Sequence, residues 1–436
     1  MRLQHWGFGS VLLAFFMLPI LPAQAESLSL ESVTQQAVER SFALQIAHLD
    51  IQIGKAGEGI VKADYFPTLK ANFNTEYLKD LEKTPQPVVA VGSSIIPSGT
   101  RYQNSLGLSS QYTILDFGAR QRRLRMAQAE TQAKGATYFQ TFRDLRLKLV
   151  DLYAEALISY RQLQGQSDLL KLAQRGYQLK KRLYEAGTQS RVDVAQEAMQ
   201  VAQALDAIQG HRAQLAEELE QLSYFTQMDY DPETTTLSDF TGDPEAQTLS
   251  ISLSHSPEAQ QYDAQIRAKQ AEMELLRRQA LPQVSLYSYY NLYGFDPDRP
   301  GKAITGLSQR TISLGLNVAM PLFDGFKTRG QLQKAQLEQE KLRLQKAEKL
   351  AQLKQQADLY QTQVSGRLVS LKTKVIVLNS AQDKLQLVAR LTENQVVDAT
   401  QEIQAQLSRG QQQMAAEKAL IEQMAALKKL QILAEG

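Results

Sequence analysis

The chain contains the same layout twice, and this internal duplication constrains its fold more than any other feature. Residues 41–77 and 256–293 each run from an Ala- and Gln-rich helical segment, through a proline, into an alternating stretch. The two prolines, Pro67 and Pro282, are 215 positions apart, and each stands at the start of a predicted strand. Because a missed duplication misassigns the whole fold, the repeated unit is the basis for every later step.

A second correspondence lies where the strands of each copy give way to a helix. Asp116 and Gly118 match Asp324 and Gly325 when the two glycines are aligned, which gives an offset of 207. The offset falls by 8 residues (215 − 207), so the second copy has a shorter loop between its strands. We expect each Asp to be the N-cap of the long helix that follows it.

The N-terminus has the features of an export signal. Arg2 precedes a short apolar core, and Ala23-Gln24-Ala25 is a small-x-small cleavage site. Pro19 and Pro22 break this stretch well short of the ~20 apolar residues that a spanning helix needs. The sequence therefore predicts a signal peptide, two structural repeats and a turn-rich linker between the repeats. Their bounds are 1–25 for the signal peptide, 26–228 and 256–436 for the repeats, and 229–255 for the linker.

Four stretches alternate apolar and polar residues with the period of a strand, at about 68–80, 102–115, 283–294 and 307–320. Each has roughly ten residues, the length with which a tilted strand crosses a bilayer. An aromatic girdle at the membrane surface is a further expectation, from Tyr287, Tyr289, Tyr290 and Tyr293. An ordinary half-buried sheet in a soluble domain gives the same alternation, so the strands alone leave both readings open.

Two very long helices are predicted, one in each copy. From Gly118 to about Glu185 there is no Pro, and apolar residues recur seven apart, as they do from Leu350 to Leu385. A sustained heptad stripe indicates packing along a partner helix. At ~1.5 Å per residue, about 65 residues span roughly 100 Å, so the molecule is an elongated tube or rod.

The end of the first long helix is marked by a tight turn. Gly187 suits a left-handed residue after a helix, and Ser190 and Asp193 have the spacing of a capping box. Each copy is therefore helix, strand, loop, strand, long helix, turn and helix.

Four strands of membrane length cannot close a barrel, because the smallest closed barrels need about eight. Open edges would leave backbone groups unpaired in lipid, at several kcal/mol each. Chains must therefore combine, and three copies of four strands make about twelve, within the range of known barrels. The expected fold class is mainly α with a β-barrel portion that continues into a helical tunnel.

Composition excludes most enzyme chemistry. With 48 Lys and Arg against 46 Asp and Glu, there is no strong field to attract nucleic acid. Cys is absent, and the four His are too widely separated in sequence for metal-ligand spacing. The G-x-S-x-G, H-E-x-x-H and Walker A motifs are absent as well. We expect no catalytic residue, no cofactor and no metal, and hence no enzyme.

These motifs, in this order and duplicated, resemble the TolC-like outer-membrane efflux proteins over nearly all of the chain after the signal peptide. The residues that carry the resemblance are Phe66-Pro67-Thr68-Leu69, the two Asp- and Gly-containing junctions, and the turn from Tyr184 to Val194. The resemblance implies a homotrimer with a twelve-stranded barrel in the outer-membrane lipid and a periplasmic tunnel of packed helices. It also implies a passive exit duct for efflux or type I secretion, docked to a periplasmic adaptor (membrane fusion protein) and an inner-membrane pump of RND, ABC or MFS type.

The resemblance further implies a periplasmic gate with acidic residues just after the helix turns. The matching residues are Asp193 in the first repeat and, at an offset of 209, Glu402 in the second. The second repeat departs from the family pattern, since Val396 stands where Gly is expected. A capping-box role explains Asp193 without a gate, and a solvated first-turn acid explains Glu402.

Two other classes share some of these features. A periplasmic adaptor or structural rod also has long helical hairpins, but it needs compact β-rich domains beside a single hairpin. A trimeric coiled-coil adhesin has one continuous heptad run rather than hairpins that return twice. The duplicated unit with few strands favours the duct over both.

Overall fold

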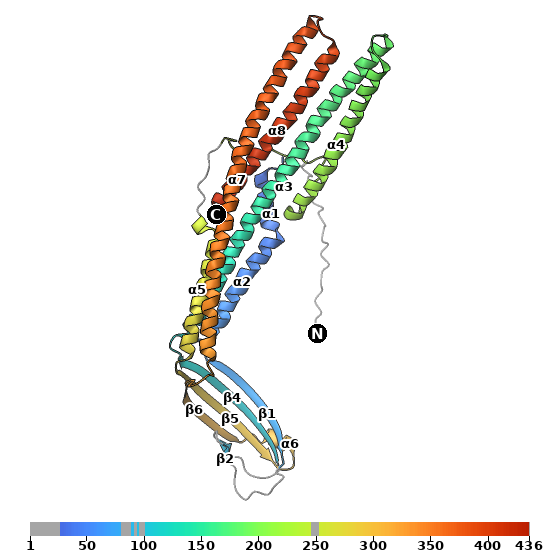
Figure 1. Ribbon diagram of the computed structural model, residues 1–436. Coiled ribbons are helices and arrows are strands. Elements are labelled where there is room, and N and C mark those ends of the chain that lie inside the picture. Colours follow the sequence, from blue (N-terminus) through green and yellow to red (C-terminus); the bar gives the residue numbers. More distant parts are fainter. Residues whose placement is uncertain (1–26, 80–88, 91–93, 96–100, 246–252, 436) are drawn as a thin grey trace, which may run out of the picture.

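The computed structural model describes residues 27–79, 89–90, 94–95, 101–245 and 253–435, so the predicted signal peptide lies outside the described residues. The molecule is elongated, with long helices at one end and a sheet at the other (Figure 1). In chain order the elements are α1 (Leu30–Arg40), α2 (Phe42–Ala63), β1 (Thr68–Leu78), β2 (Val89–Ala90), β3 (Ser94–Ile95), β4 (Arg101–Leu115), α3 (Ala119–Glu185), α4 (Arg191–Thr226), η1 (Leu253–His255), α5 (Pro257–Gln279), β5 (Gln283–Asp296), α6 (Pro300–Thr305), β6 (Gln309–Ala319), α7 (Lys327–Glu393) and α8 (Ala399–Glu435).

The element order repeats along the chain. The series α2, β1, β4, α3, α4 is followed by α5, β5, β6, α7, α8. Helices α3 and α7 each have 67 residues, which corresponds to about 100 Å at ~1.5 Å per residue. Each turns back through a tight turn into α4 or α8, so the turns lie at the end of the molecule farthest from the sheet (Figure 1).

The helices form one layer whose order changes along its length. Near the sheet, α2 packs on α3, α3 on α5, and α5 on α7. Farther from the sheet, α4 packs on α3, α3 on α8, and α8 on α7. Helices α2 and α4 therefore form one edge of the layer, and α7 forms the other.

The main hydrophobic core lies at mid-length, where α1 and the linker cover the long helices. Leu149 and Leu157 of α3 are fully buried among apolar residues of α1, α4 and α8. Tyr153 is also buried there, and its hydroxyl contacts the carbonyl oxygens of Leu28 at 2.7 Å and Ser238 at 2.5 Å. Burial raises the pKa of Tyr153 to about 12. This hydroxyl joins the first described residues to the linker and to α3.

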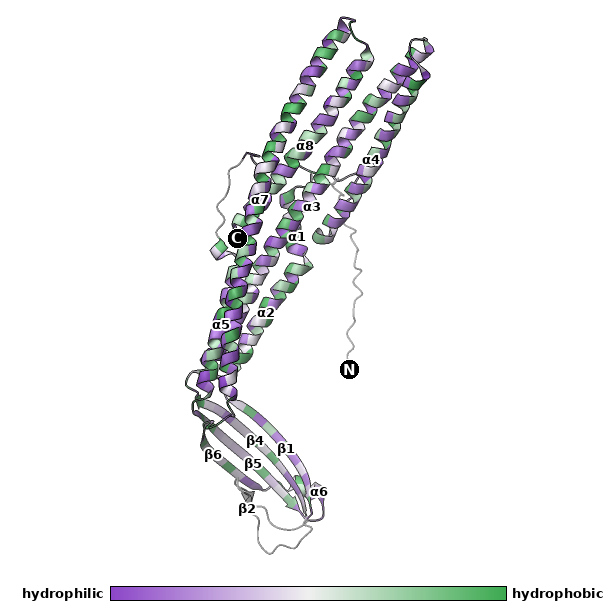
Figure 2. Ribbon diagram, in the orientation of Figure 1, coloured by the Kyte–Doolittle hydropathy of each residue, from purple (hydrophilic) through white to green (hydrophobic). Residues whose placement is uncertain are grey.

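The larger sheet has the strand order β1-β4-β5-β6, and every neighbouring pair is antiparallel. Strands β1 and β6 are its edges, and β2 pairs with β3 separately. None of the described helices combines the length and the apolarity needed to cross a membrane. Figure 2 shows apolar and polar residues interleaved along all of α3 and α7.

Candidate functional site

One face of the four-stranded sheet is apolar. The strand register places Phe73 beside Leu106, Leu106 beside Leu292, and Tyr290 beside Ile312, all on the same face. Four β6 side chains continue this face and are largely exposed in the single chain: Ile312 (79%), Leu314 (72%), Leu316 (63%) and Val318 (66%). An exposed apolar surface of this extent marks a face that contacts another molecule or a membrane.

The opposite face is polar. It carries Asn72, Ser105, Gln111, Asn291 and Ser313, which alternate with the apolar residues along each strand. This alternation, with both faces open, is the pattern of a strand between lipid and a water-filled lumen.

The predicted tyrosine girdle is largely wrong. Tyr290 lies on the apolar face, but the register places Tyr287, Tyr289 and Tyr293 on the polar face. The reason is the period of two, which sends odd-numbered β5 residues to the face opposite Tyr290. The ring of Tyr287 instead lies over Gly315, where a Cβ atom would be 2.4 Å from it.

Aromatic residues do lie at both ends of the strands, at positions that the sequence analysis missed. At the far end Tyr77 and Tyr102 are in contact, with ring centroids 4.9 Å apart. At the helix end a group of aromatic residues is exposed in the junctions: Phe66, Phe117, Phe323 and Phe326. Aromatic residues at both ends of the strands are typical of strands that cross a membrane.

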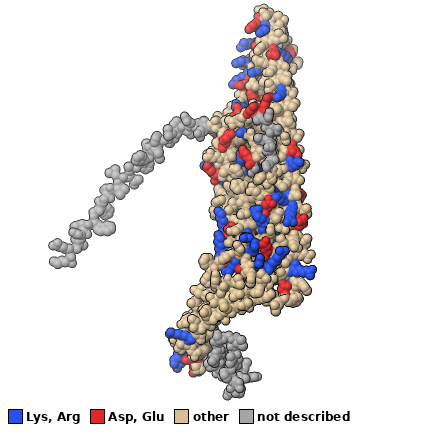
Figure 3. Space-filling view, turned by 90° about the vertical axis from the view of Figure 1, so that its left-hand side faces the viewer, with Lys and Arg blue, Asp and Glu red and all other residues tan. Residues whose placement is uncertain are grey.

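Charged side chains avoid the apolar face. Within the described strands of this sheet, the charged residues on that face are Asp296 and Arg310, both at the end far from the helices. In Figure 3 a band without charge separates the charged helical body from the charges at the tip. A charge-free band between charged ends is what a bilayer requires of a surface.

Among the described residues, no element covers either edge of the molecule, in the sheet or in the helical layer. An exposed apolar stripe follows the α2 edge: Phe42, Ile46, Leu49, Ile53 and Ile60. Another follows α7 on the opposite edge and includes Leu337, Leu344, Leu359, Val369 and Ile376. Since β1 follows α2 and β6 precedes α7, each side of the molecule combines a free strand with an apolar helix.

The two strand-to-helix junctions have the same geometry, but the sequence alignment of them was off by one residue. Helix α3 begins at Ala119 and α7 at Lys327, an offset of 208 rather than 207 (327 − 119). Asp116 therefore corresponds to Asp324, whereas Gly118 corresponds to Phe326 and Gly325 to Phe117. The two residues before each helix, Phe117 with Gly118 and Gly325 with Phe326, all have positive φ (50° to 87°). Each junction therefore needs two consecutive left-handed residues, and glycine occupies only one of the two positions.

The N-cap prediction for Asp116 and Asp324 is corrected by the same geometry. The N-cap residues are Gly118 and Phe326, two positions later. The carboxylates nevertheless cap the first turn: Asp116 accepts from Arg120 N at 2.8 Å, and Asp324 from Thr328 N at 2.9 Å. The left-handed pair folds the backbone so that an acid outside the helix reaches its free N–H groups.

Acid should loosen the first junction. Burial alone raises the pKa of Asp116, but hydrogen bonds from the Arg120 and Gly118 N–H groups and from the Arg120 side chain lower it below 3.8. The stability from this carboxylate is present above pH 3.8 and is lost as the pH falls through the lower folded pKa. Asp116→Asn should cost about 1 kcal/mol at pH 6. This cost should shrink toward pH 3, as thermal unfolding followed by circular dichroism would measure. Asp168→Asn, in an exposed ion pair with Lys171, is the control; a cost for Asp116→Asn that is independent of pH contradicts the assignment.

Pro67 is the residue directly before β1, and Pro282 is the residue directly before β5. Both lie between the end of a helix and a strand, where the missing N–H removes no ladder hydrogen bond. Their fixed φ ends α2 and α5 and directs the chain into the sheet.

The first helix turn has the capping geometry that the sequence indicates. Gly187 has φ +77°, and Thr188 N donates to Leu183 O at 2.9 Å. The Asp193 carboxylate accepts from Ser190 N at 3.0 Å and from its hydroxyl at 2.7 Å. These hydrogen bonds from Ser190 lower the pKa of Asp193. Asp193 is therefore a charged residue at the exposed end of the molecule and a helix cap at the same time.

The second turn repeats this geometry at an offset of 208. Gln395, with φ +59°, takes the place of Gly187, and Val396 N donates to Leu391 O at 2.9 Å. Asp398 directly precedes α8, as Ser190 precedes α4. The counterpart of Asp193 is thus Gln401, and Glu402 lies one residue farther along. The offset of 209 that paired Asp193 with Glu402 is corrected accordingly. Glu402 is half-buried, and its carboxylate accepts from Gln406 at 3.3 Å.

Comparison with known proteins accords with this geometry. Residues 33–226 match the family model described as outer membrane efflux protein. The chain is thus similar to the outer membrane efflux proteins over most of its first predicted repeat. The resemblance to the TolC-like family that the sequence indicates is thereby confirmed. Protein CyaE of Bordetella pertussis is 25% identical over 324 residues, which cover 72% of this chain and 64% of CyaE. The chain thus spans less than two thirds of that relative.

Solved structures share the efflux-protein fold. The CmeC outer membrane channel of Campylobacter jejuni has a TM-score of 0.75 at 13% identity, over 93% of this chain and 85% of CmeC. The outer membrane protein VceC of Vibrio cholerae has a TM-score of 0.70 at 16% identity, over 92% and 95% of the two chains. At these identities the likeness establishes the fold.

Proposed function

We propose that three copies of this efflux protein form a passive duct that spans the outer membrane and extends into the periplasm. The observation that carries this proposal is the amphipathic sheet with two free edges. Its apolar face would lie against lipid and its polar face would line a water-filled lumen. The duct would need no catalytic chemistry.

The edges support a ring rather than an open assembly. Each strand is antiparallel to its neighbours, so β6 of one copy and β1 of the next would also run antiparallel, as an even number of strands requires. The apolar stripe on α7 would pack against α2 of the next copy at the same interface. Such a head-to-tail contact closes into a ring when the rotation fits. Three copies would give about twelve strands, a number that outer-membrane barrels use.

The same proposal gives roles to the other segments of the chain and to its partners. Residues 1–25 would be the export signal, and 26–228 and 256–436 would be structural repeats joined by 229–255. The partners would be a periplasmic adaptor of the membrane fusion type and an inner-membrane pump, in efflux or type I secretion. An adaptor or rod is the competing function, but it has no use for an exposed apolar sheet face.

The direct test is the mass of the purified protein in detergent together with its single-channel conductance in a planar bilayer. A trimer that conducts ions supports the duct. A monomer that stays in solution without detergent would contradict it and favour the adaptor or rod.

Selectivity at the helix turns tests the proposed gate. If three Glu402 side chains ring the tunnel mouth, Glu402→Gln should lower the preference for cations by roughly two- to threefold, as expected for unit charges interacting through water. Asp193→Asn should lower it as well and should also weaken the cap of α4. The measurement is the reversal potential under a salt gradient, with Asp168→Asn on the flank of α3 as the control. Unchanged selectivity and conductance in Glu402→Gln would remove Glu402 from the gate.

A further inference from the structure

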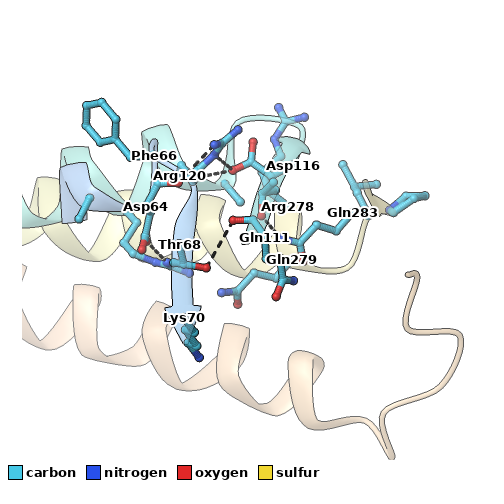
Figure 4. Close-up of a pocket in the computed structure, with 16 residues that line it drawn as sticks. Asp64, Phe66, Thr68, Lys70, Gln111, Asp116, Arg120, Arg278, Gln279 and Gln283 are labelled. Atoms are coloured by element: carbon cyan, nitrogen blue, oxygen red, sulfur yellow. Dashed lines mark hydrogen bonds and ion pairs between the residues drawn. The ribbon is translucent and has the colours of Figure 1, made fainter. Parts of the chain in front are cut away.

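A cavity of about 500 Å³ lies where the polar face of the sheet meets the helices. Six elements converge on it, and Figure 4 shows residues of α2, β1, β4, α3, the end of α5 and the start of β5 around one hollow. The sheet residues in its wall include Thr68, Lys70, Gln111 and Gln283, all of them on the polar face.

The charge in this wall is positive. Four cationic side chains line the cavity, Lys70, Arg120, Arg123 and Arg278, against two acids, Asp64 and Asp116. Both acids are already engaged. Asp64 is paired with Arg123, and Asp116 with Arg120 at 2.9 Å and with the amides of α3.

Two cations remain without an acid. In the part of the chain that the structure describes, no ion pair involves Lys70 or Arg278. Lys70 lies in β1 and Arg278 in the last turn of α5, so residues of both repeats meet at this cavity.

The neutral residues of the wall add hydrogen-bond donors. Gln111, Gln279 and Gln283 each carry an amide NH₂ with two N–H groups. Gln283 uses one of its two on the Thr113 hydroxyl at 3.4 Å, and the Thr68 hydroxyl donates to the Gln111 carbonyl oxygen at 3.4 Å. Cations together with the remaining amide donors match a group with several acceptor oxygens and negative charge, such as phosphate or carboxylate.

We propose that this cavity is a binding site for a solute oxyanion, with Lys70 and Arg278 as the charged residues that hold it. The proposal rests on the proposed duct and deepens it, since three such sites would surround the lumen where the barrel meets the tunnel. A lipid headgroup is the other source of a phosphate, but it would approach the apolar face, and the cavity opens on the polar one.

Calorimetric titration of inorganic phosphate into the purified protein tests the site without requiring conduction. We expect saturable binding in the unaltered chain. The Lys70→Gln, Arg278→Gln double variant should bind at least ~10-fold more weakly, since it loses two charge-assisted contacts. Arg310→Gln is the control for loss of a cation from the same sheet, because it removes one positive charge from the apolar face. Equal phosphate affinity in all three proteins overturns the proposal, as does binding of phosphatidylglycerol vesicles in place of free phosphate.

Reversal potentials in planar bilayers give the second measurement. The double variant should shift permeability toward cations by roughly threefold, the effect of nearby unit charges in water, whereas Arg310→Gln should not. Equal shifts in both variants overturn the proposal. Phosphate binding by a protein that forms no channel would contradict the duct and leave the oxyanion site standing, so the two failures are distinguishable.

Discussion

Replacing Arg143 with methionine should destabilise the protein by about 3–5 kcal/mol, because it leaves a buried carboxylate without its partner. Arg143 of α3 and Glu258 of α5 form a bidentate pair, with nitrogen–oxygen distances of 2.9 and 2.5 Å. The Glu258 side chain is 1% exposed. This pair joins a helix of the first repeat to the first turn of the second.

The pH dependence of this effect has a definite sign. Burial raises the pKa of Glu258, but the hydrogen bonds and charge of Arg143 outweigh burial and hold it below 4.5. Without Arg143, burial dominates and the pKa of Glu258 rises above its unfolded value. The variant then binds a proton on folding, so its deficit against the unaltered protein should shrink as the pH falls from 7 toward 4.5.

Urea unfolding followed by helical circular dichroism, at one protein concentration, measures this deficit. The double variant Arg143→Met, Glu258→Gln should recover most of the loss, because the uncompensated charge is gone. Lys372→Met is the control, since its pair with Glu245 is exposed (58% and 61%) and should contribute less than about 1 kcal/mol. A deficit for Arg143→Met no larger than that of the control would contradict the assignment.

Local sequence patterns predict the helices and strands of this fold. The alternation after Pro67 predicts a strand, and β1 begins at Thr68. The Pro-free heptad run from Gly118 predicts a helix to about Glu185, and α3 ends there. Such signals depend on neighbouring residues, which sequence shows directly.

The alignment of the turns of the first repeat with those of the second could not be obtained from such local patterns. The alignment of the strand-to-helix junctions treated glycine as the marker of the residue before the helix, but Phe326 occupies that position in the second repeat. The alignment of the helix turns paired the acids Asp193 and Glu402 and so missed Gln395, the left-handed counterpart of Gly187. Both alignments were wrong by one residue. The backbone hydrogen bonds of the turn, which sequence does not display, give the correct offset of 208.

Contacts between distant elements were equally hidden. Arg143 and Glu258 are 115 residues apart, and each alone looks like a solvated helix charge. The cavity with Lys70 and Arg278 is lined by six elements from both repeats. The amphipathic sheet was foreseen from alternation, whereas the exposed Phe residues at its helix end were not, because they lie in turns rather than in strands.

The assignment of the apolar face to lipid makes the second large prediction. Leu314→Arg places a charge near the middle of β6, between Ile312 and Leu316 on that face. A cation at the bilayer midplane should cost about 2–4 kcal/mol in a membrane barrel. Ser313→Arg adds the same charge one residue away on the polar face, where water would solvate it.

Comparing the stability of the two variants distinguishes the cost of placing arginine in lipid from any general effect of adding arginine to β6. Urea titration of the protein refolded in lipid vesicles, scored by heat-resistant oligomer on gels, should show Leu314→Arg unfolding first and Ser313→Arg close to the unaltered protein. In an adaptor or rod the order would differ, since Arg at position 314 would then lie in water and would improve solubility. Equal stability of the two variants would therefore contradict the assignment of the apolar face to lipid. Without lipid on that face, the chains would have no reason to share one ring.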